Sequence, residues 1–311
     1  MGFTRLHLYT GYSFLKSALT VPKAVGFAKK MGAEFISVCD FGSLSGAPEL
    51  AKLAPQYGLK PLYGMDALID GNLFSLFVEN ENGYRNLLQI CLKHSQKSLD
   101  LPFLKGHLDG LIVVLDGHNS FLAYADRGKF PEIARTLAAI SEGIPCFCLG
   151  LPYEEKSADF VNFLREFAAK YPYSLIAFPH IRYGKKEDAI SLAILEAIAK
   201  DEQLAIKELS GDQCFLDDET ATNYFTESER NAAREIAERC SSFQLIQKRG
   251  GLLKYPCPAG ETRESYLHRL ALAGLTTRLG SVDENYQTRL AYELDVITKM
   301  GYADYFLIVA D

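Results

Sequence analysis

Imidazole and carboxylate side chains follow several short apolar runs of the sequence, where they could bind metal ions. His7 and Tyr9 stand two residues apart in one run, and Asp40, Asp66 and His180 each follow another. Alternate residues of a strand point to the same face, so His7 and Tyr9 would share one. Metal-dependent phosphoesterases use such ligands to generate a hydroxide and to clamp phosphate oxygens. Tyrosine is not a useful ligand for Zn or Mn in such a site, so the set is incomplete.

A structural role competes with metal binding for these residues. We expect His7 to be hydrogen-bonded inside the fold rather than to act as a ligand. Asp40 and Asp66 are expected to form ion pairs with Lys16 or Arg182, because an unpaired buried charge is costly.

Short runs rich in Val, Ile, Leu and Phe alternate with segments of helical periodicity in the first part of the chain. We predict strands over 5–9, 34–39, 59–68, 73–79, 110–115, 145–150 and 174–178, and helices over 21–31, 46–57, 82–94, 130–142 and 157–171. This alternation predicts parallel strands covered by helices. No Gly-x-Gly-x-x-Gly follows the first strand, so a barrel is favoured over a dinucleotide-binding open sheet. In a barrel, polar residues at the C-terminal ends of the strands form the site.

The pattern changes at about residue 185, after which helices dominate. They are predicted over 186–200, 226–241, 263–279 and 285–300. The stretch 245–262 is rich in glycine and proline, and is expected to be an extended connector. The sequence therefore predicts a first domain over 1–244 with a helical extension from about 185, a linker over 245–262, and a truncated helical segment over 263–311.

The composition excludes several classes of protein. Of 311 residues, 48% are apolar and 23% are charged, which is typical of a globular protein. No apolar run approaches the roughly 20 residues that span a bilayer, and no signal sequence is evident, so we expect a cytoplasmic protein with no membrane partner. The net charge of −6 does not indicate nucleic-acid binding by bulk electrostatics. Seven cysteines without a CxxC pair argue against a disulfide framework and against a zinc site.

A series of motifs runs through the chain in order. These are FTRLHLYTGYS (3–13), CDFGSLSG (39–46), GLKPLYGMD (58–66), NGYRNL (82–87) and RYGKKED (182–188), followed by EIAERC (235–240), RLAYELDVI (289–297) and KMGYADYFLIVAD (299–311). The motifs resemble the PHP (polymerase and histidinol phosphatase) domain that opens bacterial DNA polymerase III α subunits. The last of them are similar to the start of the polymerase core. The resemblance covers almost the whole chain, and it implies a PHP-type distorted (β/α)7 barrel followed by a smaller, mainly helical segment.

The same resemblance implies a degenerate metal site. Where the metal-binding version of the domain has metal ligands, this chain has a set of eight residues, several of them substituted: His7, Tyr9, Lys16, Asp40, Phe41, Asp66, His180 and Arg182. Tyr9 and Phe41 replace histidines and Asp66 replaces a glutamate, while Lys16 and Arg182 introduce cations that would repel a metal. If any ion binds, His7, Asp40 and Asp66 are the expected ligands.

The resemblance implies that the parent protein is a DNA-directed DNA polymerase, a Mg-dependent nucleotidyltransferase of DNA replication. We expect this fragment to be inactive, to hold no cofactor and to serve as a structural and docking domain. Its expected partners are the rest of the α subunit, a proofreading exonuclease and other replisome subunits, with DNA reached through the parent protein.

Two enzymatic functions remain as alternative hypotheses. The first is a metal-dependent phosphoesterase or 3′→5′ proofreading nuclease, which would use Zn or Mn at the residual site. The second is a free-standing enzyme similar to histidinol phosphatase, against which residues 226–311 weigh, because a phosphatase does not need them. The apolar end of the chain, 301–311, is expected to have its packing partners elsewhere, so 285–311 is predicted to be poorly packed or to borrow contacts from the barrel.

Overall fold

The computed structural model describes residues 2–153, 158–203, 211–245, 253–281 and 283–310. The chain divides into two compact units, Met1–Ile246 and Gln247–Asp311, and each is described by itself. Residues 246–252 of the expected linker lie outside the described part of the chain. No helix among the described residues is long and apolar enough to cross a membrane.

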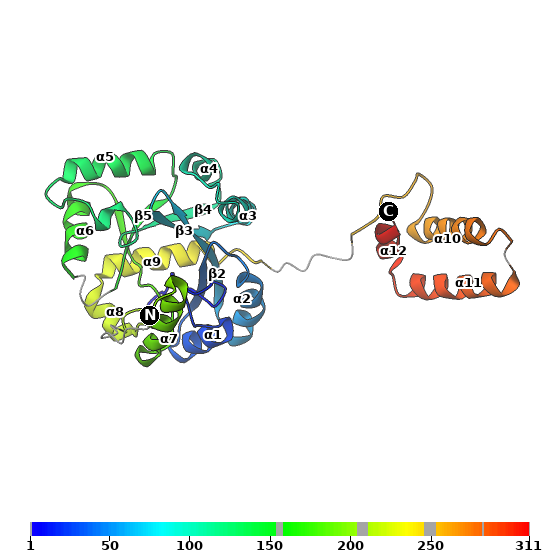
Figure 1. Cartoon of the computed structure of the whole chain (residues 1–311), viewed down its shortest axis with the longest axis horizontal. Helices are drawn as coiled ribbons and strands as arrows, with labels where there is room; N and C mark the ends of the chain where they lie inside the picture. The colour runs from blue at the N-terminus through cyan, green and yellow to red at the C-terminus, as the bar shows by residue number, and fades with distance from the viewer. Residues whose placement is uncertain (1, 154–157, 204–210, 246–252, 282, 311) are drawn as a thin grey trace. The chain divides into compact units, whose positions relative to one another are not determined.

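A six-stranded sheet organises the first unit (Figure 1). Its strands follow chain order: β1 (Phe35–Phe41), β2 (Lys60–Ile69), β3 (Asn72–Val78), β4 (Leu111–Asp116), β5 (Phe147–Leu151) and β6 (Ser174–Ala177). β1 and β2 are parallel, as are β4, β5 and β6, but β3 is antiparallel to both of its neighbours. The α/β class is confirmed, and the prediction of parallel strands throughout is wrong at β3.

The reversal at β3 has a local cause in a tight turn. Only Asp70 and Gly71 separate β2 from β3, and their φ angles are 49° and 75°. Two central residues with positive φ form the type of turn that joins antiparallel strands, and Asp-Gly is a favoured pair for it. A parallel connection would need a crossover of a dozen or more residues.

The predicted strand 5–9 is not a regular strand, because it makes a single isolated bridge between Leu8 and Ile181. The Tyr9 amide donates to the Ile181 carbonyl at 2.9 Å, and the Ile181 amide donates to the His7 carbonyl at 3.1 Å. On its other side, the Cys39 amide of β1 donates to the Leu8 carbonyl at 2.9 Å. The segment therefore connects β1, at one edge of the sheet, with the chain that follows β6 at the other edge, and in this way it closes the ring of a barrel.

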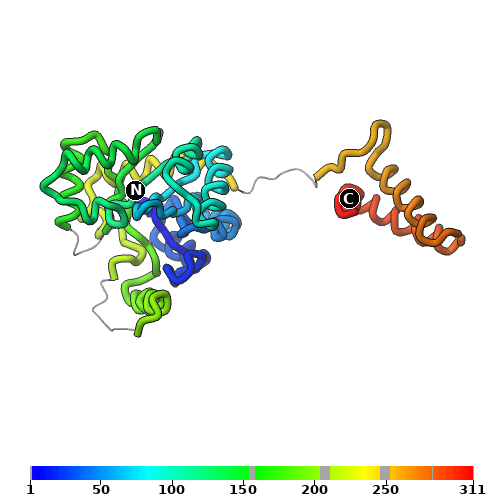
Figure 2. The backbone as a smooth tube through the Cα atoms, turned by 45° about the horizontal axis from the view of Figure 1, so that its top comes forward, coloured from blue at the N-terminus to red at the C-terminus, as the bar shows by residue number. Residues whose placement is uncertain are grey.

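Helices surround the strands of the first unit (Figure 1). They include α1 (Val21–Lys30), α2 (Ala47–Leu53), α3 (Glu81–Ser95), α5 (Phe130–Ser141), α6 (Ala158–Lys170), α7 (Ala189–Lys200) and α9 (Glu227–Cys240). The predicted helix 46–57 ends in a separate 3-10 turn, Ala54–Tyr57, at Pro55. Two short helices were not predicted: α4 (Leu101–Lys105) and α8 (Asp218–Tyr224). Figure 2 shows α7 extending from the body of this unit.

The hydrophobic core of the first unit lies around the sheet. Every residue of β3 and of β4 is buried. Such continuous burial is typical of strands covered on both faces. The core side chains thereby exclude water from the middle of the barrel, where the polar residues of the strand ends lie.

The second unit is a small helical assembly of α10 (Arg263–Leu279), α11 (Glu284–Lys299) and α12 (Ala303–Ala310). Its core consists of Leu267, Leu294, Ala303 and Leu307. The prediction that 285–311 is poorly packed holds only in part. Leu307 is 2% exposed inside this unit, whereas Phe306 and Ile308 on either side are 44% and 42% exposed.

Candidate functional site

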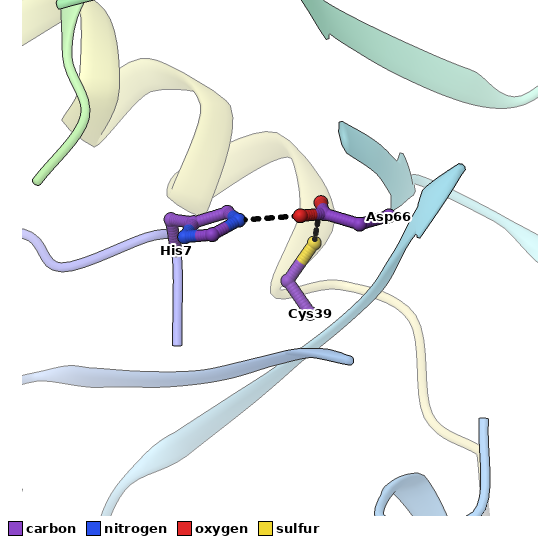
Figure 3. A group of neighbouring side chains, drawn as sticks. All are labelled: His7, Cys39 and Asp66. Carbon is purple, nitrogen blue, oxygen red and sulfur yellow. Dashed lines mark hydrogen bonds and ion pairs between the residues drawn. The ribbon is translucent and has the colours of Figure 1, made fainter. Parts of the chain in front are cut away.

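Asp66 lies at the centre of the buried polar residues, and β2 positions it in the barrel interior. Its Oδ2 accepts hydrogen bonds from His7 Nε2 at 2.7 Å and from the Tyr9 hydroxyl. Its Oδ1 accepts from Cys39 Sγ at 3.2 Å and from Ser75 Oγ at 2.5 Å. Figure 3 shows the His7 ring and the Cys39 thiol both directed at this carboxylate. A carboxylate has about four acceptor positions, so the four donors occupy all of them.

The protonation states of this group follow from its burial. Burial by itself would raise the pKa of Asp66, but His7 and the other donors more than offset this, so its pKa lies below the usual value. Burial lowers the pKa of His7, which favours the neutral ring. Burial and the nearby Asp66 raise the pKa of Tyr9 and of Cys39, so both keep their protons. The stable arrangement is one carboxylate surrounded by protonated donors.

Asp40 is held by a separate set of donors at the end of β1. Its Oδ1 accepts from the Thr10 amide at 2.6 Å and from Ser13 Oγ at 2.6 Å, and its Oδ2 accepts from Thr10 Oγ1 at 2.8 Å. Burial raises the pKa of Asp40, and these hydrogen bonds oppose the rise. A β-carbon on Gly46 would lie 2.8 Å from Oδ2, so the backbone closes over the remaining side. Asp40 therefore fixes the loop after the first segment.

His180 pairs with a carboxylate that the sequence prediction missed. Its Nε2 lies 2.6 Å from Oδ2 of Asp116, the last residue of β4. Asp116 also accepts from the amides of His118 and Asn119 at 2.9 and 3.0 Å. Burial acts to lower the pKa of His180, but Asp116 outweighs it, so the pKa is raised. Burial acts to raise the pKa of Asp116, yet His180 holds it well below its usual range.

The two histidine–carboxylate pairs lie against each other. The ring centroids of His7 and His180 are 4.3 Å apart, and the rings are tilted by 37°. Each ring also packs near Phe178. Two imidazolium charges at this distance would repel each other, and the charge of His180 lowers the pKa of His7. One charged and one neutral histidine is the arrangement that the surroundings favour.

Lys16 and Arg182 do not pair with Asp40 or Asp66, so the expected ion pairs are wrong for the described residues. Lys16 Nζ lies 4.4 Å from the ring centroid of Phe41. Arg182 binds Glu196 with an N–O distance of 3.0 Å, and its guanidinium lies over the ring of Tyr9. Imidazole, hydroxyl, thiol and backbone N–H groups donate to the two carboxylates instead. The prediction for His7 is confirmed in its hydrogen bonding to Asp66.

One group in the described part of the chain has the donor set for a metal ion. Ligand atoms of His7, Cys39 and Asp66 all lie within 4.8 Å of one another, and all three residues are buried. Nitrogen, sulfur and oxygen donors suit zinc. However, metals bind the thiolate form of cysteine, and the raised pKa of Cys39 opposes it. An ion would also have to displace donors from Asp66. The residues could therefore hold a single ion, and they do not fit a centre of two or three ions. Asp40, which we expected as a ligand, is not in this group.

Comparison with known proteins gives two matches to families. Residues 5–149 match the PHP domain, and residues 265–311 match the bacterial DNA polymerase III alpha NTPase domain. Neither match covers the chain between residues 150 and 264.

Curated relatives align with essentially the whole chain. DNA polymerase III subunit alpha of Bacillus subtilis is 29% identical over 329 residues, which include 100% of this chain and 29% of that protein. The same subunit of Treponema pallidum is also 29% identical, with the same two coverages. The chain therefore spans less than a third of the length of these relatives.

Among solved structures, an amidohydrolase from Chromobacterium violaceum with bound sulfate and no metal gives a TM-score of 0.40 at 12% identity. The match covers 56% of this chain and 86% of that one.

Proposed function

We propose, from the premise that this chain is a PHP domain followed by the first part of a DNA polymerase III α subunit, that it is a structural and docking domain of a replicative polymerase. In the whole protein, Mg-dependent nucleotide transfer would be carried out by residues outside this chain. The chain itself would neither polymerise nor hydrolyse DNA. The proposal implies a cytoplasmic protein of the replisome.

The observation that supports the structural role is the complete occupation of Asp66. His7, Tyr9, Cys39 and Ser75 donate to all of its acceptor positions, and each of these side chains is buried. Internal hydrogen bonds thus supply the stabilisation that a metal would supply to a cluster of ligands. Leaving a buried acceptor unsatisfied would cost about 1–3 kcal/mol, so the four donors to Asp66 favour a fixed structure.

Exposed apolar side chains on the second unit support its docking to further polymerase. Val309 is 68% exposed, Met300 61% and Tyr292 59%. These residues lie in or beside α11 and α12, whose core is small. The rest of the α subunit is the proposed occupant of this surface. A proofreading exonuclease and other replisome subunits are further proposed partners.

The alternative is a metal-dependent phosphoesterase or 3′→5′ nuclease with Zn or Mn. The ligand atoms of His7, Cys39 and Asp66 lie within 4.8 Å of one another, which favours this alternative. When bound, such an ion would activate water and polarise a phosphate ester. The chain's own contribution would be to hold the ion with those three residues and to exclude water with Phe178 beside His7.

Metal content and hydrolysis, measured together, test the proposal. The purified chain is dialysed against Zn or Mn, its bound metal is quantified by mass spectrometry, and release of nucleotides from the 3′ end of single-stranded DNA is followed with and without chelator. We expect less than one ion per chain and no chelator-sensitive release. One or more ions per chain, with hydrolysis that is lost in Asp66→Asn and kept in the exposed control Asp70→Asn, would overturn the structural assignment.

A further inference from the structure

A polar pocket lies between α7 and the loop that follows residues 5–9. Its volume is about 330 Å³. Its lining comes from three parts of the sequence: Phe14, Leu15 and Lys16, then Arg182, then Glu196, Ala199 and Lys200. None of these residues donates to Asp40 or Asp66, so the pocket is distinct from the buried hydrogen-bond network described above.

The pocket has an excess of positive charge. Three cations line it, Lys16, Arg182 and Lys200, against the single carboxylate of Glu196. Glu196 pairs with Arg182, and neither lysine forms an ion pair with any residue that the structure describes. Burial and the neighbouring Arg182 lower the pKa of Lys16, and Glu196 and Asp66 oppose this shift only in part. A bound anion would add negative charge beside these cations.

An aromatic ring stands at the edge of the same pocket. Phe14 is 81% exposed although it is a large apolar side chain. The next residue, Leu15, has a φ of 58°, a left-handed conformation that is unfavourable for leucine. The Lys16 amide closes this turn by donating to the Ser13 carbonyl at 2.8 Å. The loop therefore contains a strained residue, Leu15, and exposes the ring of Phe14 to solvent next to three cations.

We propose that this pocket binds a nucleotide, with its phosphate between Lys16, Arg182 and Lys200 and its base stacked on Phe14. Lysine and arginine side chains are the usual partners of phosphate oxygens, and aromatic rings stack on bases of any sequence. The nucleotide comes either from single-stranded DNA or from a free mononucleotide, since both offer the same phosphate and base. The inference goes beyond the structural role proposed above, and binding here needs no metal.

Fluorescence polarisation with the whole chain tests this pocket, with EDTA present in every arm. The probe is a short labelled oligodeoxythymidylate, and unlabelled thymidine monophosphate and inorganic phosphate serve as competitors. We expect Lys200→Ala to weaken binding by about fivefold to tenfold and to reduce the dependence on salt by about one phosphate contact. Phe14→Ala is expected to weaken binding by about tenfold, because it removes one stacked base.

Two further variants test whether the positive charge of the pocket controls the affinity for the probe. Glu196→Gln removes the carboxylate and frees Arg182, so we expect severalfold tighter binding. Lys30→Ala removes an exposed lysine of α1 away from the pocket and should leave binding unchanged. Competition by the mononucleotide would identify it as the source, and competition by DNA alone would identify the strand. Any of three results would overturn the proposal. These are a probe that does not bind, equal effects of Lys200→Ala and Lys30→Ala, and an affinity that Phe14→Ala leaves unchanged. Since EDTA is present throughout, none of these results depends on whether the barrel holds a metal.

Discussion

The imidazole rings of His7 and His180 lie 4.3 Å apart inside the barrel, and each faces its own buried carboxylate. The two carboxylates come from one sheet, Asp66 from β2 and Asp116 from β4, with β3 between these strands. The result is a pair of histidine–aspartate contacts packed ring to ring. Their opposite pKa shifts follow from this arrangement and give the first prediction.

The two histidines should titrate on opposite sides of the usual value of about 6.5. The pKa of His180 is raised by Asp116, and the pKa of His7 is lowered by burial. The His180 pair therefore adds to the free energy of unfolding below pH 6.5 and loses its effect as the pH rises through the folded pKa. The lowered pKa of His7 has the opposite effect. It reduces the free energy of unfolding as the pH falls below 6.5, because the unfolded state binds the proton first. NMR titration of the two ring protons measures both shifts. Equal midpoints would contradict the assignment.

Asp66→Asn should destabilise the first unit strongly. An amide offers fewer acceptor positions and directs its own N–H groups at the donors of His7 and Tyr9. A hydrogen bond to a charged group contributes about 1.5–3 kcal/mol, and we expect the free energy of unfolding to fall by about 3 kcal/mol. Urea unfolding followed by near-ultraviolet circular dichroism measures it. Asp70→Asn lies in an exposed turn and should change little. A loss below about 1 kcal/mol for Asp66→Asn would show that the network adds little stability.

Ser13→Ala removes a donor to Asp40 and an acceptor for the Phe41 amide, which donates to Ser13 Oγ at 3.0 Å. We expect the free energy of unfolding to fall by about 1–3 kcal/mol, because buried polar groups are left unsatisfied. Ser95→Ala, on the exposed surface of α3, is the control. Equal stabilities of the two variants would indicate that water replaces the Ser13 hydroxyl.

Leu307→Ala should unfold the second unit, while Val309→Ala should not. Leu307 is 2% exposed and Val309 is 68% exposed, although both lie on α12. Truncating a buried leucine costs about 2–5 kcal/mol, which is large for a core of four residues. Loss of helical circular dichroism, without change in the aromatic signal of the first unit, is the expected readout. If both variants behave alike, this core does not hold the helices together.

Much of the barrel could be predicted from sequence because its strands are short apolar runs with polar ends. Asp40, Asp66 and His180 were found in this way. Asp116 was missed although it follows the same rule, since the predicted strand stopped one residue short of it. The Asp70-Gly71 pair is a sequence signal for a hairpin, which the regular alternation of strands and helices does not predict.

The hydrogen-bond partners of the buried carboxylates could not be predicted from the sequence. Charge alone suggested that Lys16 and Arg182 would neutralise Asp66, but the network that forms uses Tyr9 and Cys39. Which donors reach a buried oxygen depends on strand register and on side-chain direction, and no periodicity encodes either of them. The short helix α12 was missed because its continuous apolar sequence has no helical periodicity.

The bonds of Tyr9 and His7 to Ile181 have a consequence for the order of folding. Residues 7–9 are synthesised long before Ile181, so the ring of strands cannot close until this later segment is available. Contacts between residues so distant in sequence also form slowly, because a long loop must be closed first. Pulsed hydrogen exchange during refolding should therefore show the Tyr9 and Ile181 amides protected after those of the β2–β3 hairpin.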